Sequence, residues 1–212
     1  MTDDHAVPFS AWLRQMQLAL AEKQPADVPC GSCNACCRTS HFVHVRAEER
    51  KALGLIPREL LYPAPGLPPG NMVMGYDETG CCPMLVCSKC SIYHHRPIAC
   101  RTYDCRIYAA TGVSADREDV ATQVKRWRFS YPTRQDHELH EAVTAAAGFI
   151  QDPHTSPLSV TARREPVRVA VLAVAVHREF LDGEAGARRR PRTVRDRSLA
   201  ILAADEELFG DG

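Results

Sequence analysis

The chain has no excess of charge of one sign. Its 212 residues include 26 Lys and Arg and 26 Asp and Glu, so the formal net charge is zero when histidine is neutral. Proteins that bind nucleic acid over a broad surface carry an excess of basic residues, because the phosphate backbone is anionic. The balanced charge therefore argues against a nucleic-acid-binding protein.

Long apolar runs are absent as well. The longest one, residues 169–176, is far shorter than the about 20 residues that a membrane-spanning helix needs. The opening residues are acidic and lead into no apolar stretch with a cleavage site, so we expect no export signal and no membrane partner. These absences predict a cytoplasmic protein, in which thiols stay reduced.

Cysteine is missing from the second half of the chain, because all ten cysteines lie between Cys30 and Cys105. In a reducing compartment such a cluster indicates metal binding or catalysis rather than structural disulfide bonds. Inert buried thiols are the alternative, but they would have no reason to follow a regular spacing.

The first cysteine group follows the pattern C-x2-C-x2-C-C and consists of Cys30, Cys33, Cys36 and Cys37. A gap of two residues lets the chain turn tightly, so that both sulfur atoms reach one metal. The small or turn-forming residues Gly31, Ser32 and Asn34 fill these gaps. Two overlapping C-x2-C pairs are a strong signal for a metal site.

The second group contains Cys81, Cys82, Cys87, Cys90, Cys100 and Cys105. Tetrahedral zinc and four-iron clusters both take four thiolates, usually from two chain segments, and two separated groups supply them. Arg96 and Arg101 stand among these cysteines, and their positive charge would partly neutralise the thiolates. We therefore expect both arginines to support the bound cofactor.

These motifs resemble those of the CxxCxxCC family, bacterial proteins described as zinc- or iron-chelating. The resemblance covers about residues 30–105 and rests on residues 30–37, Cys82-Pro83-Met84-Leu85, Cys90-Ser91-Ile92-Tyr93, Arg96-Pro97, Cys100-Arg101 and Cys105. It implies metal binding through Cys30, Cys33, Cys36, Cys37, Cys82, Cys90, Cys100 and Cys105, without assigning a biochemical role. The flagellin lysine methylases are distantly similar in the same cysteine signature, which implies an iron–sulfur cluster as one option.

The identity of the metal stays open at this point. Cys30, Cys33 and Cys36 with a distant Cys82-Pro83 are typical of ferredoxin-like ligation of a four-iron cluster, whereas eight thiolates also make two zinc sites. We slightly favour the 4Fe-4S cluster over zinc. Cys81 and Cys87 are extra to the family pattern, and His41, His44, His94 and His95 are more simply explained as polar surface residues than as ligands.

We predict an α+β fold in which a small, irregular, cysteine-rich, metal-stapled module is flanked by mainly helical N- and C-terminal regions. The predicted divisions are residues 1–29 (N-terminal helix and lead-in), 30–110 (metal-binding domain) and 111–212 (mainly helical region). Periodicity and capping signals predict helices at residues 10–23, with Ser10 as N-cap, and at 47–53, 98–110, 134–147, 166–181 and 198–209. Alternation predicts strands at residues 41–45, 71–76 and 126–131, an extended connector at 57–70 and an arginine-rich linker at 185–197.

Three classes of function follow from these observations. The first is a metal-binding protein whose biochemical role is otherwise unassigned. The second is an iron–sulfur enzyme that modifies a protein side chain, although no glycine-rich nucleotide loop is present. The third is a redox or metal sensor, which needs a protein partner.

The pair His137 and His140 could hold a second metal or act as an acid–base pair, but a solvated helix face is the preferred interpretation.

Overall fold

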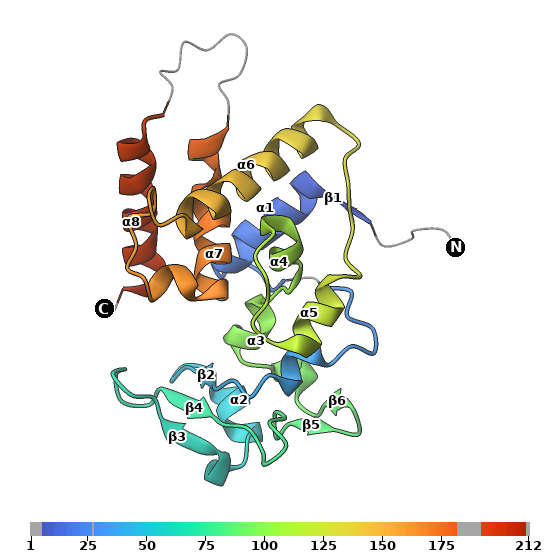
Figure 1. Ribbon diagram of the computed structural model, residues 1–212. Coiled ribbons are helices and arrows are strands. Elements are labelled where there is room, and N and C mark those ends of the chain that lie inside the picture. The colour runs from blue at the N-terminus through green and yellow to red at the C-terminus, as the bar shows by residue number, and fades with distance from the viewer. Residues whose placement is uncertain (1–5, 27, 182–191, 211–212) are drawn as a thin grey trace. The chain divides into compact units, whose positions relative to one another are not determined.

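The computed structural model describes residues 6–26, 28–181 and 192–210 and shows an α+β protein (Figure 1), which confirms the α+β part of the predicted fold class. The chain forms two compact units. The helical unit comprises the described residues of 1–17, 105–116 and 124–212, and the cysteine unit comprises those of 18–104 and 117–123. The chain thus passes more than once between the two units. The predicted divisions after residues 29 and 110 follow the sequence motifs and stay predictions.

The helical unit is built around one apolar helix. Its elements are β1 (Val7–Pro8), α1 (Phe9–Leu20, whose last three residues belong to the cysteine unit), α4 (Arg106–Thr111), β7 (Phe129–Ser130), α6 (Arg134–Gln151), η4 (Ala162–Arg164), α7 (Pro166–Val176), η5 (His177–Phe180) and α8 (Val194–Phe209). Helix α7 packs against α4, α6 and α8, and most of its side chains are buried. Pro166 begins this helix, where a missing N–H costs no hydrogen bond. Strands β1 and β7 form a short parallel pair.

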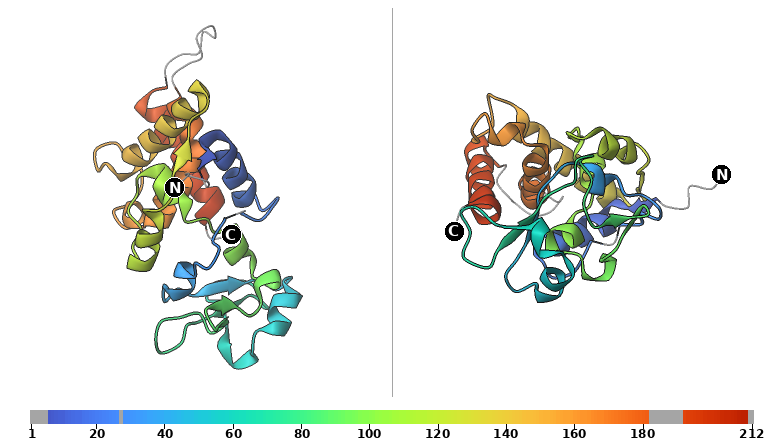
Figure 2. Two further views of the ribbon diagram at one scale, coloured as in Figure 1. Left: turned by 90° about the vertical axis from the view of Figure 1, so that its right-hand side faces the viewer. Right: turned by 90° about the horizontal axis from the view of Figure 1, so that it is seen from below.

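The cysteine unit combines a small antiparallel sheet with short helices. Its elements are η1 (Ala35–Arg38), β2 (Val43–Val45), α2 (Arg50–Leu55), η2 (Arg58–Leu60), β3 (Leu61–Pro63), β4 (Met72–Met74), β5 (Leu85–Val86), β6 (Lys89–Cys90), η3 (Tyr93–His95), α3 (Ile98–Thr102) and α5 (Glu118–Val124), whose last residue belongs to the helical unit. The strand order is β2-β4-β3, and β5 and β6 form a separate hairpin. Helix α2 lies beside the sheet (Figure 2). Ala52 of this helix joins Val45 and Met74 of the sheet in a buried apolar cluster.

Several predicted elements are confirmed, most of them with shifted ends. Helices form at α1, α2, α6, α7 and α8, and the strands expected at 41–45, 71–76 and 126–131 appear in shorter form as β2, β4 and β7. Ser10 lies inside α1 and is not its N-cap. Its backbone N–H donates instead to Asp136 Oδ1 at 2.9 Å, because the first turn of α1 lies beside the first turn of α6.

Two predicted segments are wrong in part. The connector at residues 57–70 contains the strand β3. This strand tolerates Pro63 because β3 lies at the edge of the sheet, where proline is found in strands. The helix predicted at 98–110 is divided into α3 and α4, because Tyr103 takes an extended conformation at the end of α3. This break comes just before Cys105, where the chain leaves the cysteine unit.

The arginine-rich linker is also shorter than predicted. Residues 185–191 of this segment lie outside the described residues. Helix α8 begins at Val194, earlier than the expected residue 198, because Thr193 and Asp196 form a capping box at its start. The arginines from 195 onward are therefore helical.

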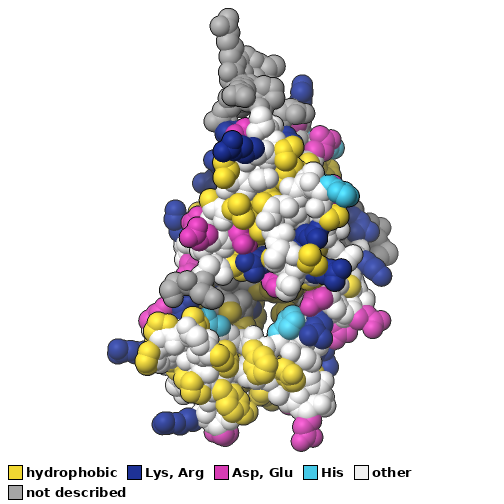
Figure 3. All heavy atoms as spheres, turned by 60° about the vertical axis from the view of Figure 1, so that its left-hand side comes forward, with side chains coloured by type: hydrophobic (Ala, Val, Ile, Leu, Met, Phe, Trp, Pro, Cys, Tyr) yellow, Lys and Arg dark blue, Asp and Glu magenta, His cyan; other side chains and the backbone are white. Residues whose placement is uncertain are grey.

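Exposed apolar side chains gather on one face of the cysteine unit (Figure 3). The large ones in this unit are Phe42, Leu55, Tyr62, Leu67, Tyr76, Val86 and Tyr93. Within the three described stretches of the chain, no helix is both long and apolar enough to cross a membrane.

Candidate metal centre

The first cysteine group forms a compact series of turns, as its spacing predicted. The Cys33 N–H donates to the Cys30 carbonyl at 2.8 Å, and the Cys37 N–H donates to the Asn34 carbonyl at 2.9 Å. Gly31 has a φ of 56°, a left-handed conformation that favours glycine and allows the first turn. The sulfur atoms of this group are therefore carried on a short, tightly turned backbone.

The second group is shaped by the hairpin of β5 and β6. The Leu85 N–H donates to the Cys82 carbonyl at 2.9 Å, and Cys90 pairs with Leu85 across the hairpin. Cys87 and Ser88 form its turn with φ values of 48° and 62°. Cys82 and Cys90 are partly buried and pack against the apolar cluster around Met84, so the hairpin holds both residues in place.

Hydrogen bonds join the two cysteine groups across more than forty residues of sequence. The Cys82 N–H donates to the Cys37 carbonyl at 2.7 Å. The Asn34 side-chain amide donates to the Ser88 carbonyl at 3.4 Å. The two cysteine-bearing loops therefore lie side by side, although no signal in the sequence specified these bonds.

Four thiols from four different segments interact electrostatically in this arrangement. Burial raises the pKa of Cys100 to about 12, with further contributions from Cys82, Cys36 and Cys90, and Arg96 opposes the increase. Burial also raises the pKa of Cys82, and nearby Cys90 and Cys36 add to this effect, whereas a backbone hydrogen bond opposes it. Each thiol therefore makes it harder for its neighbours to ionise.

Cys36 also belongs to the first group. A hydrogen bond from the Cys37 side chain is the largest cause of a Cys36 pKa well above the usual range, followed by burial. Burial raises the pKa of Cys30 to about 11, with contributions from Cys36 and Cys33. Cys36 therefore interacts electrostatically with thiols of both cysteine groups.

The thiols are neighbours without forming a finished coordination sphere. All ten cysteines are free thiols. In the described part of the chain, no three His, Cys, Asp or Glu side chains are placed so as to hold a metal ion. The donor chemistry itself suits zinc or iron–sulfur ligation, because both require thiolates. Ligation here would require loss of the thiol protons.

Arg96 lies near the thiols, where its position in the sequence predicts a compensating charge. Its guanidinium lies 3.8 Å from the centre of the Tyr93 ring, and its Nε donates to the Tyr93 carbonyl at 3.0 Å. Its positive charge lowers the pKa of three cysteines, namely Cys30, Cys36 and Cys100, against the larger effects that raise it.

Arg101 is held by other partners. Its Nε donates to the Arg96 carbonyl at 2.9 Å, and its guanidinium lies 3.6 Å from Glu49 Oε1. A direct role of Arg101 at the thiols stays a prediction. Glu49, which no motif in the sequence marks, is an acidic partner of this arginine.

The remaining cysteines have different surroundings. Cys105, one of the eight predicted ligands, belongs to the helical unit, and its sulfur accepts a hydrogen bond from Trp127 Nε1 at 3.2 Å. Cys81 lies 3.8 Å from Nη1 of Arg38. Cys87 is exposed at the hairpin turn. Cys36, Cys82, Cys90 and Cys100 are therefore close enough to interact electrostatically, and Cys30, Cys33 and Cys37 lie near Cys36 in the first group.

The histidines contribute to other sites. His44 Nε2 is 2.9 Å from Asn71 Oδ1 in the sheet, and His94 and His95 line a pocket described below. The prediction that His140 lies on a solvated helix face is wrong. Its half-buried ring stacks on Phe9 and bonds the Tyr131 hydroxyl at 2.6 Å. The stack forms because α6 packs beside α1, which the periodicity of α6 alone did not show.

No family model matches the chain, and neither a curated protein nor a solved structure matches it at a significant level.

Proposed function

We propose that the cysteine unit is a metal-binding module whose thiolates hold an iron–sulfur cluster or zinc, at a site formed by Cys36, Cys82, Cys90 and Cys100. The observation that carries the proposal is the junction of the two cysteine loops, where the Cys82 N–H donates to the Cys37 carbonyl at 2.7 Å. This bond brings together thiols whose C-x2-C spacing already indicates a metal site.

The crowding of thiols supports ligation rather than an inert core. Burial and mutual repulsion raise the pKa of Cys82 and Cys100, so without a cation these groups stay protonated at neutral pH. A bound cation reverses this preference, because it stabilises the thiolate form and releases the protons. The proposal includes a cytoplasmic location, where reducing conditions keep the ten thiols free of disulfide bonds.

The protein residues around the thiols have separable tasks. The β5–β6 hairpin and the apolar cluster position Cys82 and Cys90, and the Asn34–Ser88 hydrogen bond holds the first loop against the second. Arg96 supplies positive charge beside the thiolates, which carry a net negative charge when they bind a metal. Cys30, Cys33 and Cys37 are adjacent donors, and Cys105 stays a prediction from the sequence.

The two candidate metals would supply different chemistry. Zinc would cross-link the loops structurally, whereas a four-iron cluster would add electron transfer. The ferredoxin-like cysteine spacing leads us to favour the iron–sulfur cluster slightly over zinc. The methylase-like enzyme and the sensor stay predictions from the sequence.

Anaerobic purification of the full chain, with iron, sulfide and zinc analysis and a visible absorption spectrum, tests the proposal. We expect either iron with acid-labile sulfide and a broad visible absorption, or bound zinc without colour. Cys100→Ser is expected to lose most of the metal, since serine is a poor ligand for soft metals. Cys87→Ser is the matched control, because Cys87 is exposed at the hairpin turn, and it should retain the metal.

Two results would overturn the proposal. One is wild-type protein that contains no metal and takes up neither zinc nor a reconstituted cluster under anaerobic conditions. The other is an equal loss of metal in Cys87→Ser and Cys100→Ser, which would show that binding does not depend on the grouped thiols.

A further inference from the structure

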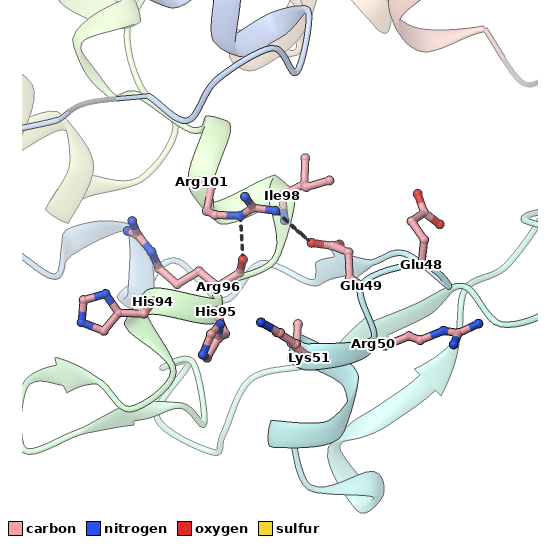
Figure 4. Close-up of a pocket in the computed structure, with 10 residues that line it drawn as sticks. Glu48, Glu49, Arg50, Lys51, His94, His95, Arg96, Ile98 and Arg101 are labelled. Carbon is pink, nitrogen blue, oxygen red and sulfur yellow. Dashed lines mark hydrogen bonds and ion pairs between the residues drawn. The ribbon is translucent and has the colours of Figure 1, made fainter.

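A second feature of the cysteine unit is a pocket of about 470 Å³ between α2 and the η3–α3 segment (Figure 4). Pockets that bind small molecules have volumes of about 300–1,000 Å³, so this one is large enough for more than a single ion. No cysteine lines the pocket, but Arg96 and Arg101 of the cysteine-containing motifs do, and Arg96 also lies near the thiols.

The lining of the pocket is basic, although the chain as a whole is neutral. Four Lys or Arg side chains and two Glu side chains line it, which gives a formal charge of +2 with histidine neutral. The two histidines, His94 and His95, add further potential donors. A concave surface with this charge attracts anions.

Glu49 offsets part of this charge, because its carboxylate lies beside the Arg101 guanidinium and is held there by two backbone N–H groups. Its side chain is only 7% exposed. One carboxylate oxygen accepts the Ile98 N–H at 2.7 Å and lies 3.6 Å from the Arg101 guanidinium, and the other accepts the Arg46 N–H at 3.0 Å. Glu49 and the Arg96 carbonyl thereby hold Arg101 in a fixed orientation, which lowers the entropic cost of binding a ligand.

Lys51 supplies a second cation, which unlike Arg101 has no anionic partner among the described residues. It extends from α2 toward His95, whereas Glu48 and Arg50 point away to the other side (Figure 4). Its ammonium forms no hydrogen bond or ion pair with any residue in the described ranges. An ammonium and an oriented guanidinium on opposite walls are a common arrangement for binding oxyanions.

We propose that this pocket binds a small organic anion with a phosphate or carboxylate group, which Lys51, His95 and Arg101 contact. The anionic group lies between Lys51 and Arg101, and the rest of the ligand fills the remaining volume. The proposal does not rest on metal binding.

An NMR titration of the full-length protein tests the pocket, with inorganic phosphate, glycerol 3-phosphate and succinate as probes. We expect saturable binding of glycerol 3-phosphate or succinate, and the probe that binds more tightly identifies the ligand as a phosphate ester or a carboxylate. Lys51→Gln should weaken this binding about tenfold or more, the usual effect of losing a charge-assisted hydrogen bond. Arg50→Gln removes the same charge from the adjacent residue and should change the affinity less than about twofold.

Failure is equally clear. No binding of any of the three probes at about 10 mM overturns the proposal. Equal weakening by Lys51→Gln and Arg50→Gln also overturns it, because this would show diffuse surface electrostatics rather than a built site. Neither residue is a proposed metal ligand, so both variants should keep the wild-type metal content. The outcome of this titration is therefore independent of the test of metal binding.

Discussion

Single side chains decide how the short segments of the cysteine unit are joined. Glu49 is the clearest example, because its carboxylate accepts backbone N–H groups from two places, Arg46 in its own loop and Ile98 at the start of α3. Cys36 has a similar position among the thiols, where it adjoins both cysteine groups. These residues connect segments that are distant in sequence, so their role is not visible from spacing.

Replacement of Glu49 should therefore destabilise the protein. In Glu49→Gln, one of the two backbone N–H groups faces an amide NH2 instead of an oxygen, and we expect a loss of about 1–3 kcal/mol in the free energy of unfolding. Glu48→Gln, a change at the exposed neighbour, should have an effect below about 0.5 kcal/mol. Urea unfolding of the two variants measures the difference, and equal stabilities would contradict the role assigned to Glu49.

Elements are joined by their ends as well as by their packed faces. Helix α6 begins with a capping box, in which the side chains of Thr133 and Asp136 bond each other's backbone N–H groups. Asp136 also accepts the N–H of Ser10 in α1 at 2.9 Å and is buried. Hydrogen bonds from Ser10 and then Thr133 hold the pKa of Asp136 well below its usual range.

This contact predicts how the helical unit responds to acid. A carboxylate with a lowered folded-state pKa adds stability above its unfolded pKa of about 3.9, and this stability is lost as the pH falls further. The thermal midpoint of wild-type protein should thus decrease below about pH 4, and Asp136→Asn should show a smaller decrease from a lower starting point. Glu141→Gln, an exposed change on the same helix, should retain the wild-type slope. Identical slopes for wild type and Asp136→Asn would refute this explanation.

The whole chain divides its apolar core unequally between the two units. In the helical unit, α1, α4, α6, α7 and α8 all contribute buried side chains to an extensive core. In the cysteine unit, the apolar cluster consists of Val45, Ala52, Ile56, Met74, Met84 and Ile92. Small cores of this kind commonly depend on metals or other cross-links for stability.

Metal removal should therefore affect the units differently. Under the proposed function, binding energy contributes to folding of the cysteine unit, so a chelator should accelerate amide hydrogen exchange in β2, β4 and the β5–β6 hairpin. Exchange in α6 and α7 should change little, because the core of the helical unit does not include the proposed ligands. Mass spectrometry of peptides from each unit measures this contrast. Equal acceleration in both units, or none in either, would contradict the expected coupling.

Much of the local structure could be predicted from the sequence. The helical periodicity and Pro166 predicted α7, the alternating segments predicted β2 and β4, and the C-x2-C spacing predicted the tight turns at Cys30 and Cys33. The break between α3 and α4 and the edge strand β3 were missed. Both depend on which unit a segment joins or which strand it pairs with, so propensity within a short window does not reveal them.

The amino-acid sequence by itself determined the kind of chemistry, namely ten cysteines in two groups with metal-ligand spacing, and most of the helices. The tertiary structure alone decided that Cys36, Cys82, Cys90 and Cys100 are neighbours, that Cys105 belongs to the helical unit, and that Lys51 and Arg101 line one pocket. The reason is physical. Residue spacing limits only where the next few atoms of a chain can reach, whereas long-range neighbours are selected by hydrogen bonds such as that from Cys82 to Cys37 and by burial of apolar side chains.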